Sequence, residues 1–189
     1  MIIIYIHITK NFMICKNEKE KMKHLINISK DIRKLKTVDD GFNELLNLGR
    51  YFEDMAIKKV IMYHNLKDDT LINKNNNIYF DFEIENIGDI ENVKYEVKTD
   101  IKAVETNNIF VEFKSNNRDS GINKSMSNYY IIIIPYEEEP LFLMIKTLTL
   151  RDLILNNKYD RIFKPTAYNR FTGGYIFNVE TIKNHSIIL

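Results

Sequence analysis

Acidic residues and lysines recur at strand spacing in the middle of the chain. Glu96 is followed two residues later by Lys98, Glu112 is followed in the same way by Lys114, and Asp81 precedes both pairs. Each lies in a segment that alternates apolar and polar side chains, which is typical of a strand with one buried face. Carboxylates gathered on neighbouring strands can hold a divalent metal ion that activates a water molecule, and a lysine beside them can orient that water. These residues are therefore the first candidates for chemistry.

A hairpin of two antiparallel strands would bring the first two acids together. Three consecutive strands are predicted, at about residues 77–84, 93–100 and 109–114. If the first two are joined by a turn around residues 87–89, with Ile84 opposite Val93, then Asp81 lies opposite Glu96. Directly opposed residues have Cβ atoms about 4.5–5.5 Å apart, so these two carboxylates would share one face of the sheet.

The third strand is predicted to pair with the second through a loop at residues 103–105, which sets Glu112 opposite Glu96. Lys98 shares that face, because side chains two residues apart on a strand point the same way. Carboxylates in a row repel one another unless a cation neutralises them, and Mg²⁺ or Mn²⁺ meets that need. An alternative set joins Asp100 to Glu112 and the lysine after it. In this register, however, Asp100 lies four residues along the strand from Glu96 and two rungs from Glu112, so its carboxylate would approach the metal less well. The structural alternative is ordinary Glu–Lys pairing on a solvated sheet face.

The remaining elements follow from apolar periodicity and turn residues. A continuous run of β-branched and aromatic side chains predicts a strand buried on both faces in the middle of a sheet. The order of the elements predicts an α/β fold, with a central mixed sheet that contains an antiparallel meander and is flanked by helices. In chain order, these further elements are helices over 16–36 and about 40–62, the buried strand 129–134, its neighbour 141–145, a helix over about 150–156 capped by Thr149, and a last strand 175–179.

Length and composition narrow the class of protein. A chain of 189 residues without a low-complexity linker fits one domain, here divided into an N-terminal extension, residues 1–36, and an α/β domain, residues 37–189. The net charge of +1 excludes a bulk polycation, so nucleic acid would need a local patch. The lone Cys15 excludes an internal disulfide and a cysteine-based zinc cluster, and it favours a reducing, cytoplasmic compartment. No apolar stretch approaches the roughly 18 residues of a membrane span, so no membrane partner is expected.

Two further segments have the composition of nucleic-acid contacts. Ser120, Gly121 and Lys124 lie in a loop after the third predicted strand, where backbone N–H groups and a lysine charge could grip a phosphate. The segment from Lys158 to Arg170 interleaves basic and aromatic residues, as strand-binding surfaces do, so Arg170 is also a candidate contact. Ordinary connecting loops have similar compositions and are the alternative in both places.

Taken in order, these motifs resemble the PD-(D/E)XK nuclease superfamily. Asp81 is similar to its first acid, and Glu96-Val97-Lys98 is similar to its (D/E)-x-K motif. Glu53, in Gly49-Arg-Tyr-Phe-Glu53, resembles the helix glutamate that adds to the metal site in members related to Holliday-junction resolvases. The later series from Glu112 through Ser120-Gly121-Ile122 to the tyrosines before the buried strand is similar to a phage and virus branch.

The resemblance implies a restriction-endonuclease-like core and a metal-dependent endonuclease that hydrolyses DNA phosphodiester bonds, of viral, phage or mobile-element type. Asp81 and Glu96, with Glu112 or Glu53, would bind Mg²⁺ or Mn²⁺, and Lys98 would position the attacking water. The DNA could be branched or single-stranded, and relatives that cut both strands suggest a homodimer. Two other interpretations stay open. One is a non-catalytic nucleic-acid or protein-binding module that retains the nuclease fold, and the other is a viral RNA endonuclease.

Overall fold

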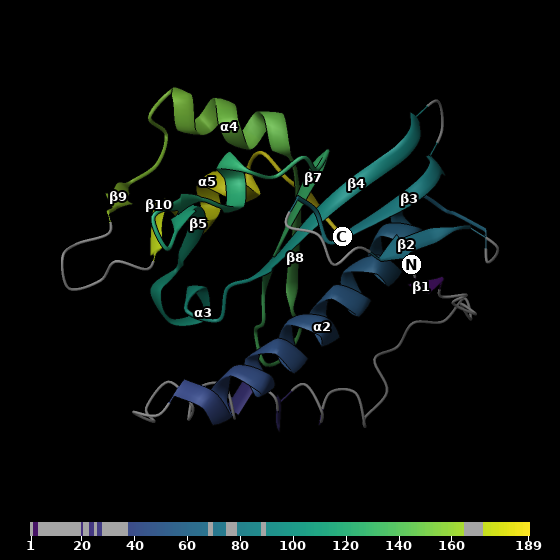
Figure 1. Ribbon diagram of the computed structural model, residues 1–189, viewed down its shortest axis with the longest axis horizontal. Helices are drawn as coiled ribbons and strands as arrows, with labels where there is room; N and C mark the ends of the chain where they lie inside the picture. Colours follow the sequence, from purple (N-terminus) through teal and green to yellow (C-terminus); the bar gives the residue numbers. More distant parts are fainter. Residues whose placement is uncertain are drawn as a thin grey trace.

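The computed structural model describes residues 2–3, 20, 23–24, 26–27, 38–67, 70–74, 79–87, 90–164 and 172–189, and the side chains of these except for 2–3, 38–45, 86–87 and 90–91. The described strands form two sheets (Figure 1). The larger is mixed and has the order β1 (Ile2–Ile3), β2 (Ile72–Lys74), β3 (Phe82–Ile87), β4 (Ile90–Thr99), β7 (Tyr129–Ile134), β8 (Leu141–Lys146) and β11 (Ile187–Ile188). The smaller is antiparallel and has the order β6 (Arg118–Asp119), β5 (Asn108–Ser115), β10 (Thr172–Asn178) and β9 (Arg161–Phe163). The predicted α/β class with a mixed sheet and flanking helices is confirmed.

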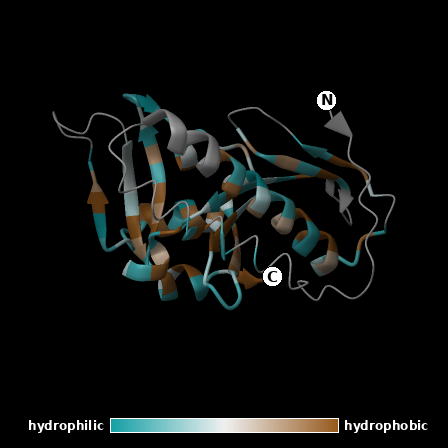
Figure 2. Ribbon diagram, turned by 90° about the horizontal axis from the view of Figure 1, so that it is seen from below, coloured by the Kyte–Doolittle hydropathy of each residue, from teal (hydrophilic) through white to brown (hydrophobic). Residues whose placement is uncertain are grey.

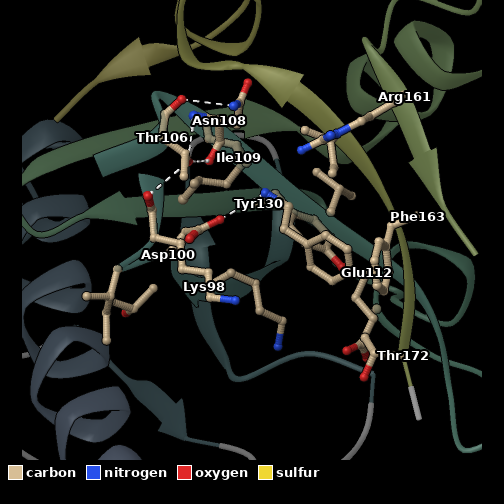
Figure 3. A pocket seen from close by; sticks show the side chains of 18 residues that line it. Lys98, Asp100, Thr106, Asn108, Ile109, Glu112, Tyr130, Arg161, Phe163 and Thr172 are labelled. Carbon is tan, nitrogen blue, oxygen red and sulfur yellow. Dashed lines mark hydrogen bonds between the residues drawn. The ribbon is translucent and has the colours of Figure 1, made fainter. Parts of the chain in front are cut away.

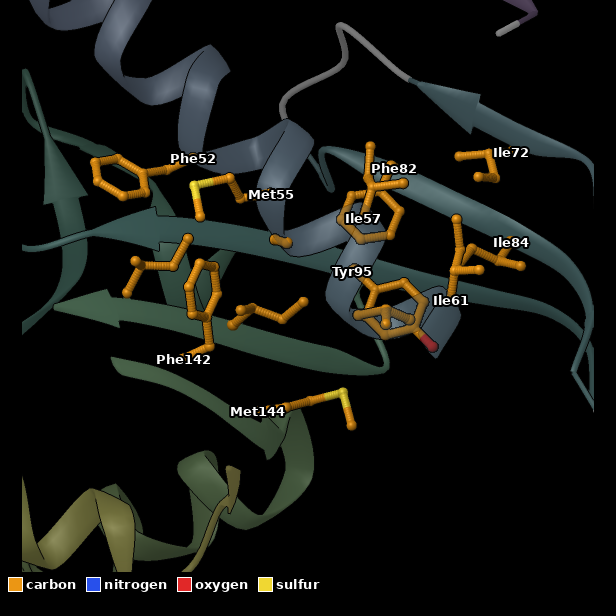
Figure 4. Close-up of a cluster of buried hydrophobic side chains, with 14 of the residues drawn as sticks. Phe52, Met55, Ile57, Ile61, Ile72, Phe82, Ile84, Tyr95, Phe142 and Met144 are labelled. Carbon is orange, nitrogen blue, oxygen red and sulfur yellow. The ribbon is translucent and has the colours of Figure 1, made fainter. Parts of the chain in front are cut away.

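Helix α2 (Val38–Tyr63) covers one face of the larger sheet, as predicted from its apolar spacing. Its buried side chains recur at three- and four-residue intervals, which puts them on one side of the helix. Figure 4 shows Phe52 and Met55 directed toward the strands that carry Tyr95 and Phe142, all four of which are at most 5% exposed. Truncating such a buried aromatic ring to alanine typically costs about 3–5 kcal/mol, so this contact is a major contribution to stability.

The β3–β4 hairpin has the predicted register. Ile84 lies opposite Val93 and Phe82 lies opposite Tyr95, so the next rung places Asp81 opposite Glu96. Phe82 stacks on Tyr95 with ring centroids 4.8 Å apart. A slip of one residue would move every buried side chain of the strand to the other face, and the apolar packing against α2 therefore specifies this pairing.

The predicted pairing of the second and third strands is wrong. The second neighbour of β4 is β7, in parallel, with Glu96 beside Tyr130, while β5 belongs to the smaller sheet. The segment predicted as a hairpin loop forms the short helix α3 (Ala103–Thr106), which leads the chain out of the larger sheet. β7 lies beside β4 in the middle of the larger sheet, and its residues from Tyr130 to Ile134 are buried on both faces.

The smaller sheet packs with α4 (Thr147–Leu155) and α5 (Val179–Lys183) on the face of the larger sheet opposite α2 (Figure 1). Ile132 and Ile145 of the larger sheet meet Val111 and Phe177 of the smaller one in a second apolar core. Buried and partly exposed residues alternate along the first half of β5, as expected of a strand with one covered face. The face of β4 that carries Glu96 therefore looks toward the smaller sheet.

Smaller predictions were also corrected. Helix α4 begins at Thr147, after the extended residue Lys146, and no side chain caps it, so Thr149 is not its N-cap. The segment after α4, predicted to be a loop, contains the edge strand β9. Most of the predicted helix over residues 16–36 lies outside the described residues, although Glu20, Lys23, His24, Ile26 and Asn27 are helical. Within the described part of the chain, no helix combines the length and apolar character needed to cross a membrane.

Candidate active site

Asp81 is held against the backbone of β4 by two hydrogen bonds, one from its own backbone and one to its side chain. Its N–H donates to the Tyr95 carbonyl oxygen at 2.9 Å, and its carboxylate oxygen Oδ2 accepts from the Val97 N–H at 2.6 Å. Tyr95 and Val97 flank Glu96 on the strand, so these bonds fix the Asp81 carboxylate beside Glu96. The predicted meeting of the first two acids is therefore present.

Glu96 is a buried carboxylate, 7% exposed, on the face that looks toward the smaller sheet. The Lys98 ammonium lies 2.6 Å from its Oε1 oxygen. Burial raises the pKa of Glu96, Lys98 lowers it, and the negative charges of Asp81 and Glu112 raise it further, with a net increase. A further cation beside Glu96 would offset the remaining cost of burying its charge and the repulsion from Asp81 and Glu112.

Lys98 lies among three carboxylates. Its side chain is 48% exposed, and partial burial by itself lowers the pKa of its ammonium group. The charges of Glu96, Asp81 and Glu112 more than offset that effect, so the pKa of Lys98 is raised. Lys98 is therefore positively charged at neutral pH and remains open to solvent on one side.

Glu112 approaches the cluster from the other sheet and not from a neighbouring strand. It lies on β5, and its charge acts on both Glu96 and Lys98. Gly121, in the 3-10 turn η1 (Gly121–Asn123), packs directly on it: with φ at +49°, a Cβ there would lie 2.2 Å from the Glu112 carbonyl oxygen. Only glycine fits so close an approach in this backbone conformation.

Glu53 lies at the margin of the cluster. Burial raises its pKa, Lys74 lowers it, and Asp81 raises it, with a net increase. Lys74 on β2 lies 3.4 Å from the Glu53 carboxylate and also pairs with Asp54. Glu53 is thus close enough to Asp81 for their charges to interact, but its ion-pair partner is Lys74.

Asp100 has a structural role in this fold, which argues against the alternative set. One carboxylate oxygen accepts from the Ala103 N–H at 3.1 Å, and the other accepts from the Phe110 N–H at 2.8 Å. The side chain therefore holds the start of α3 and the start of β5 together. Both carboxylate oxygens of Asp100 therefore already have hydrogen-bond partners outside the cluster.

The predicted substrate loop lies over β5 next to Glu112. Ser120 donates its N–H to the Phe113 carbonyl oxygen at 3.1 Å, and the Lys124 ammonium lies over the Tyr79 ring, 5.8 Å from its centroid. Arg151 of α4 braces the loop by donating to the carbonyl oxygens of Ile122 at 3.1 Å and Ser125 at 2.7 Å. Arg170 lies outside the described residues.

Sequence reasoning assigned no role in the site to two residues of this region. Tyr130 is 2% exposed and lies beside Glu96 in the parallel β4–β7 pairing. The signal for it would have been the correct strand neighbour, since pairing β4 with β7 brings Tyr130 next to Glu96 at once. Arg151 had no signal in the chain, because its contacts are carbonyl oxygens of a distant loop.

A cavity of about 740 Å³ opens between the two sheets, and Figure 3 shows its lining. Lys98 and Glu112 of the cluster line it, together with Tyr130. The residues on its other walls include Arg161 and Phe163 of the edge strand β9. A ligand in this cavity would therefore lie directly beside the lysine and carboxylates.

The donor set suits a hard divalent cation. Asp81, Glu96 and Glu112 offer only oxygen atoms, the ligands that Mg²⁺ and Mn²⁺ prefer. Across the ranges that the structure describes, no three acidic, histidine or cysteine side chains are gathered tightly enough to coordinate one ion as they stand. Lys98 occupies one Glu96 oxygen and the Val97 N–H occupies one Asp81 oxygen, so an ion would have to compete with the ammonium group.

Comparison with known proteins adds no assignment: no family model, no curated protein and no solved structure matches this chain. The resemblance to PD-(D/E)XK nucleases and the restriction-endonuclease-like core therefore stay predictions.

Proposed function

We propose that the chain is a metal-dependent endonuclease that hydrolyses DNA phosphodiester bonds. The observation that carries the proposal is the convergence of Asp81, Glu96 and Lys98 on one sheet face, with Glu112 arriving from the other sheet. Asp81, Glu96 and Glu112 would hold Mg²⁺ or Mn²⁺. A divalent ion bound there would acidify a water molecule and offset the charge that develops at the phosphorus.

Lys98 has the properties of the group that orients the attacking water. Its raised pKa keeps it protonated at neutral pH, so it can donate hydrogen bonds but cannot act as a base. Without an ion, its ammonium neutralises Glu96. A cation that took over that task would leave the ammonium free to donate to a water or a phosphate oxygen, and its half-exposed position at the cavity would allow this.

The direct test is cleavage of supercoiled and branched DNA in the presence of Mg²⁺ or Mn²⁺. Lys98→Ala should abolish cleavage without unfolding the protein, as checked by circular dichroism. Lys114→Ala is the matched control, because Lys114 follows Glu112 at the same spacing but does not line the cavity. Full cleavage by Lys98→Ala would refute the assignment, and loss of cleavage in Lys114→Ala alone would favour the alternative set.

The Glu96–Lys98 ion pair also favours a second candidate, a non-catalytic nucleic-acid or protein-binding module. The buried carboxylate already has a cation at 2.6 Å and is neutralised without any metal. Calorimetric titration with Mn²⁺ separates the candidates: the nuclease should bind the ion with measurable heat and gain thermal stability, whereas the module should do neither. Parallel incubation with single-stranded RNA and single-stranded DNA distinguishes an RNA endonuclease from a DNA endonuclease.

A further inference from the structure

The cavity between the sheets contains features that hydrolysis does not require. Besides Lys98 and Glu112, its lining includes the aromatic side chains Phe110 and Phe163 and the cation Arg161. Arg161 and Phe163 lie on the same face of β9, and the intervening Ile162 lies on the other face, as strand alternation requires. Figure 2 shows the hydrophobic residues of β9 at the outer left edge of the molecule.

Close packing and a backbone hydrogen bond hold the aromatic wall of the cavity, formed by Phe163 and Phe110, in place. The Phe163 ring is 42% exposed and meets Phe110 edge to face, with centroids 6.3 Å apart. The Phe110 ring lies on Gly174, where a Cβ would come within 2.4 Å of its Cε2 and Cζ atoms. Asp100 holds the Phe110 backbone through the 2.8 Å hydrogen bond described above. An exposed ring on so constrained a support offers a surface on which another flat ring can stack.

Tyr130 and Thr99, two hydroxyl-bearing residues of the lining, do not offer their hydroxyl groups to a ligand. Tyr130 is 2% exposed, and its hydroxyl group lies by Ser125, whose own hydroxyl donates to the Tyr79 carbonyl oxygen at 3.2 Å. Thr99 follows Val97 by two residues, so its side chain points to the α2 face of β4 and away from the cavity. The groups that a ligand can reach therefore include the exposed Phe163 ring and the cations around it.

The size and charge of the cavity restrict the ligand. Its volume of about 740 Å³ lies within the range of roughly 300–1,000 Å³ that is usual for small-molecule sites. A DNA duplex, whose major groove is by itself about 12 Å wide, is far larger than a site of this volume and cannot be taken up whole. Lys102 and Arg161 are exposed cations on the lining and could contact phosphates outside the cavity.

We propose that this cavity binds an unpaired nucleotide of single-stranded DNA. The base stacks on Phe163 and Phe110, and Lys102 and Arg161 contact the adjoining phosphates. The inference rests on the proposed function for the position of the scissile phosphate, at the carboxylates beside Lys98. It follows that the enzyme selects strands with an unpaired nucleotide next to the cleavage position, and that a fully paired duplex is a poor substrate.

The test uses the full chain in EDTA, where cleavage is blocked, and a short single-stranded DNA that carries the fluorescent base aminopurine. Stacking on the aromatic wall should quench this fluorescence, and the same sequence as a paired duplex should bind at least about 5-fold more weakly. Phe163→Ala should weaken single-strand binding at least about 5-fold, the low end of what one lost stacking contact costs. Ile162→Ala is the matched control: it changes the next residue of β9, outside the cavity, and should bind as the wild type does. A single-stranded RNA arm tests whether the sugar matters.

Equal affinity for duplex and single strand, or unchanged binding and quenching in Phe163→Ala, would overturn the inference. These outcomes differ from a failure of the proposed function. If the wild type cleaves DNA with Mg²⁺ but Phe163→Ala binds and cleaves single strands normally, the nuclease proposal survives and the nucleotide site does not. If single strands bind through Phe163 but no metal promotes cleavage, the nucleotide site survives in a binding module.

Discussion

Replacing Asp100 by alanine should destabilise the protein without removing its metal site. The Asp100 carboxylate accepts hydrogen bonds from the backbone N–H groups of Ala103 at 3.1 Å and Phe110 at 2.8 Å. Hydrogen bonds to a charged group contribute about 1.5–3 kcal/mol each. Asp100 is half-buried, so we take the low end for both and expect a loss of about 3 kcal/mol in the free energy of unfolding. For a chain of this size that lowers the melting temperature by about 6–12 °C.

The assay is thermal unfolding followed by Mn²⁺ calorimetry well below the lower melting temperature. Asp100→Asn keeps one neutral oxygen acceptor but turns its amide nitrogen, a donor, toward the other backbone N–H, so it should lose between about half and all of that stability. Asp152→Ala, at an exposed position of α4, is the control and should change the free energy of unfolding by less than about 0.5 kcal/mol. If Asp100→Ala melted at the wild-type temperature but no longer bound Mn²⁺, Asp100 would be a metal ligand, and the choice of Asp81, Glu96 and Lys98 would be wrong.

Three other predictions concern the cluster itself. Glu96→Gln should abolish Mn²⁺ binding and leave the melting temperature of the metal-free protein equal or higher. The reason is the raised pKa of Glu96, because it means that folding disfavours the ionised carboxylate. A fall of several degrees would instead mark Glu96 as a structural partner of Lys98. Metal-free protein should gain stability as pH falls from neutral through the raised pKa of Glu96 toward the ordinary value of 4.5, because the folded state takes up the proton first. Mn²⁺ affinity should weaken over the same pH range. Urea unfolding of the wild type and of Glu96→Gln at several pH values isolates the contribution of Glu96 to the free energy of unfolding. If this free energy changes with pH equally in both proteins, the stability prediction is wrong. Gly121→Ala should destabilise by more than about 1–2 kcal/mol, the cost of its left-handed backbone alone, because the new Cβ also meets the Glu112 carbonyl oxygen; an unchanged urea midpoint would contradict this contact.

The hairpin that carries Asp81 and Glu96 could be predicted from the sequence because its determinants are local. Ile84 and Val93 belong to short alternating segments that are joined by a tight turn, and only one register buries the apolar side chains of both strands. The same holds for α2, whose apolar side chains recur at the spacing of one helix face. Lys98 then follows from alternation alone, because it lies two residues after Glu96.

The position of Glu112 could not be predicted in this way. Strand neighbours that are distant along the chain are chosen by competition among segments, and β7, buried on both faces, displaced β5 from the side of β4. Glu112 still reaches the cluster, but it does so from the second sheet, across a cavity that the single-sheet arrangement would not have contained.

The sequence by itself therefore determined which residue types share the face of β4, since alternation and turn length act within a few residues. Only the tertiary structure decided what that face meets. The exit of the chain through α3, held by Asp100, builds a second sheet opposite Glu96 and Lys98. That packing buries Glu96, raises its pKa and encloses the aromatic cavity, because burial and close charges arise only when distant segments come together.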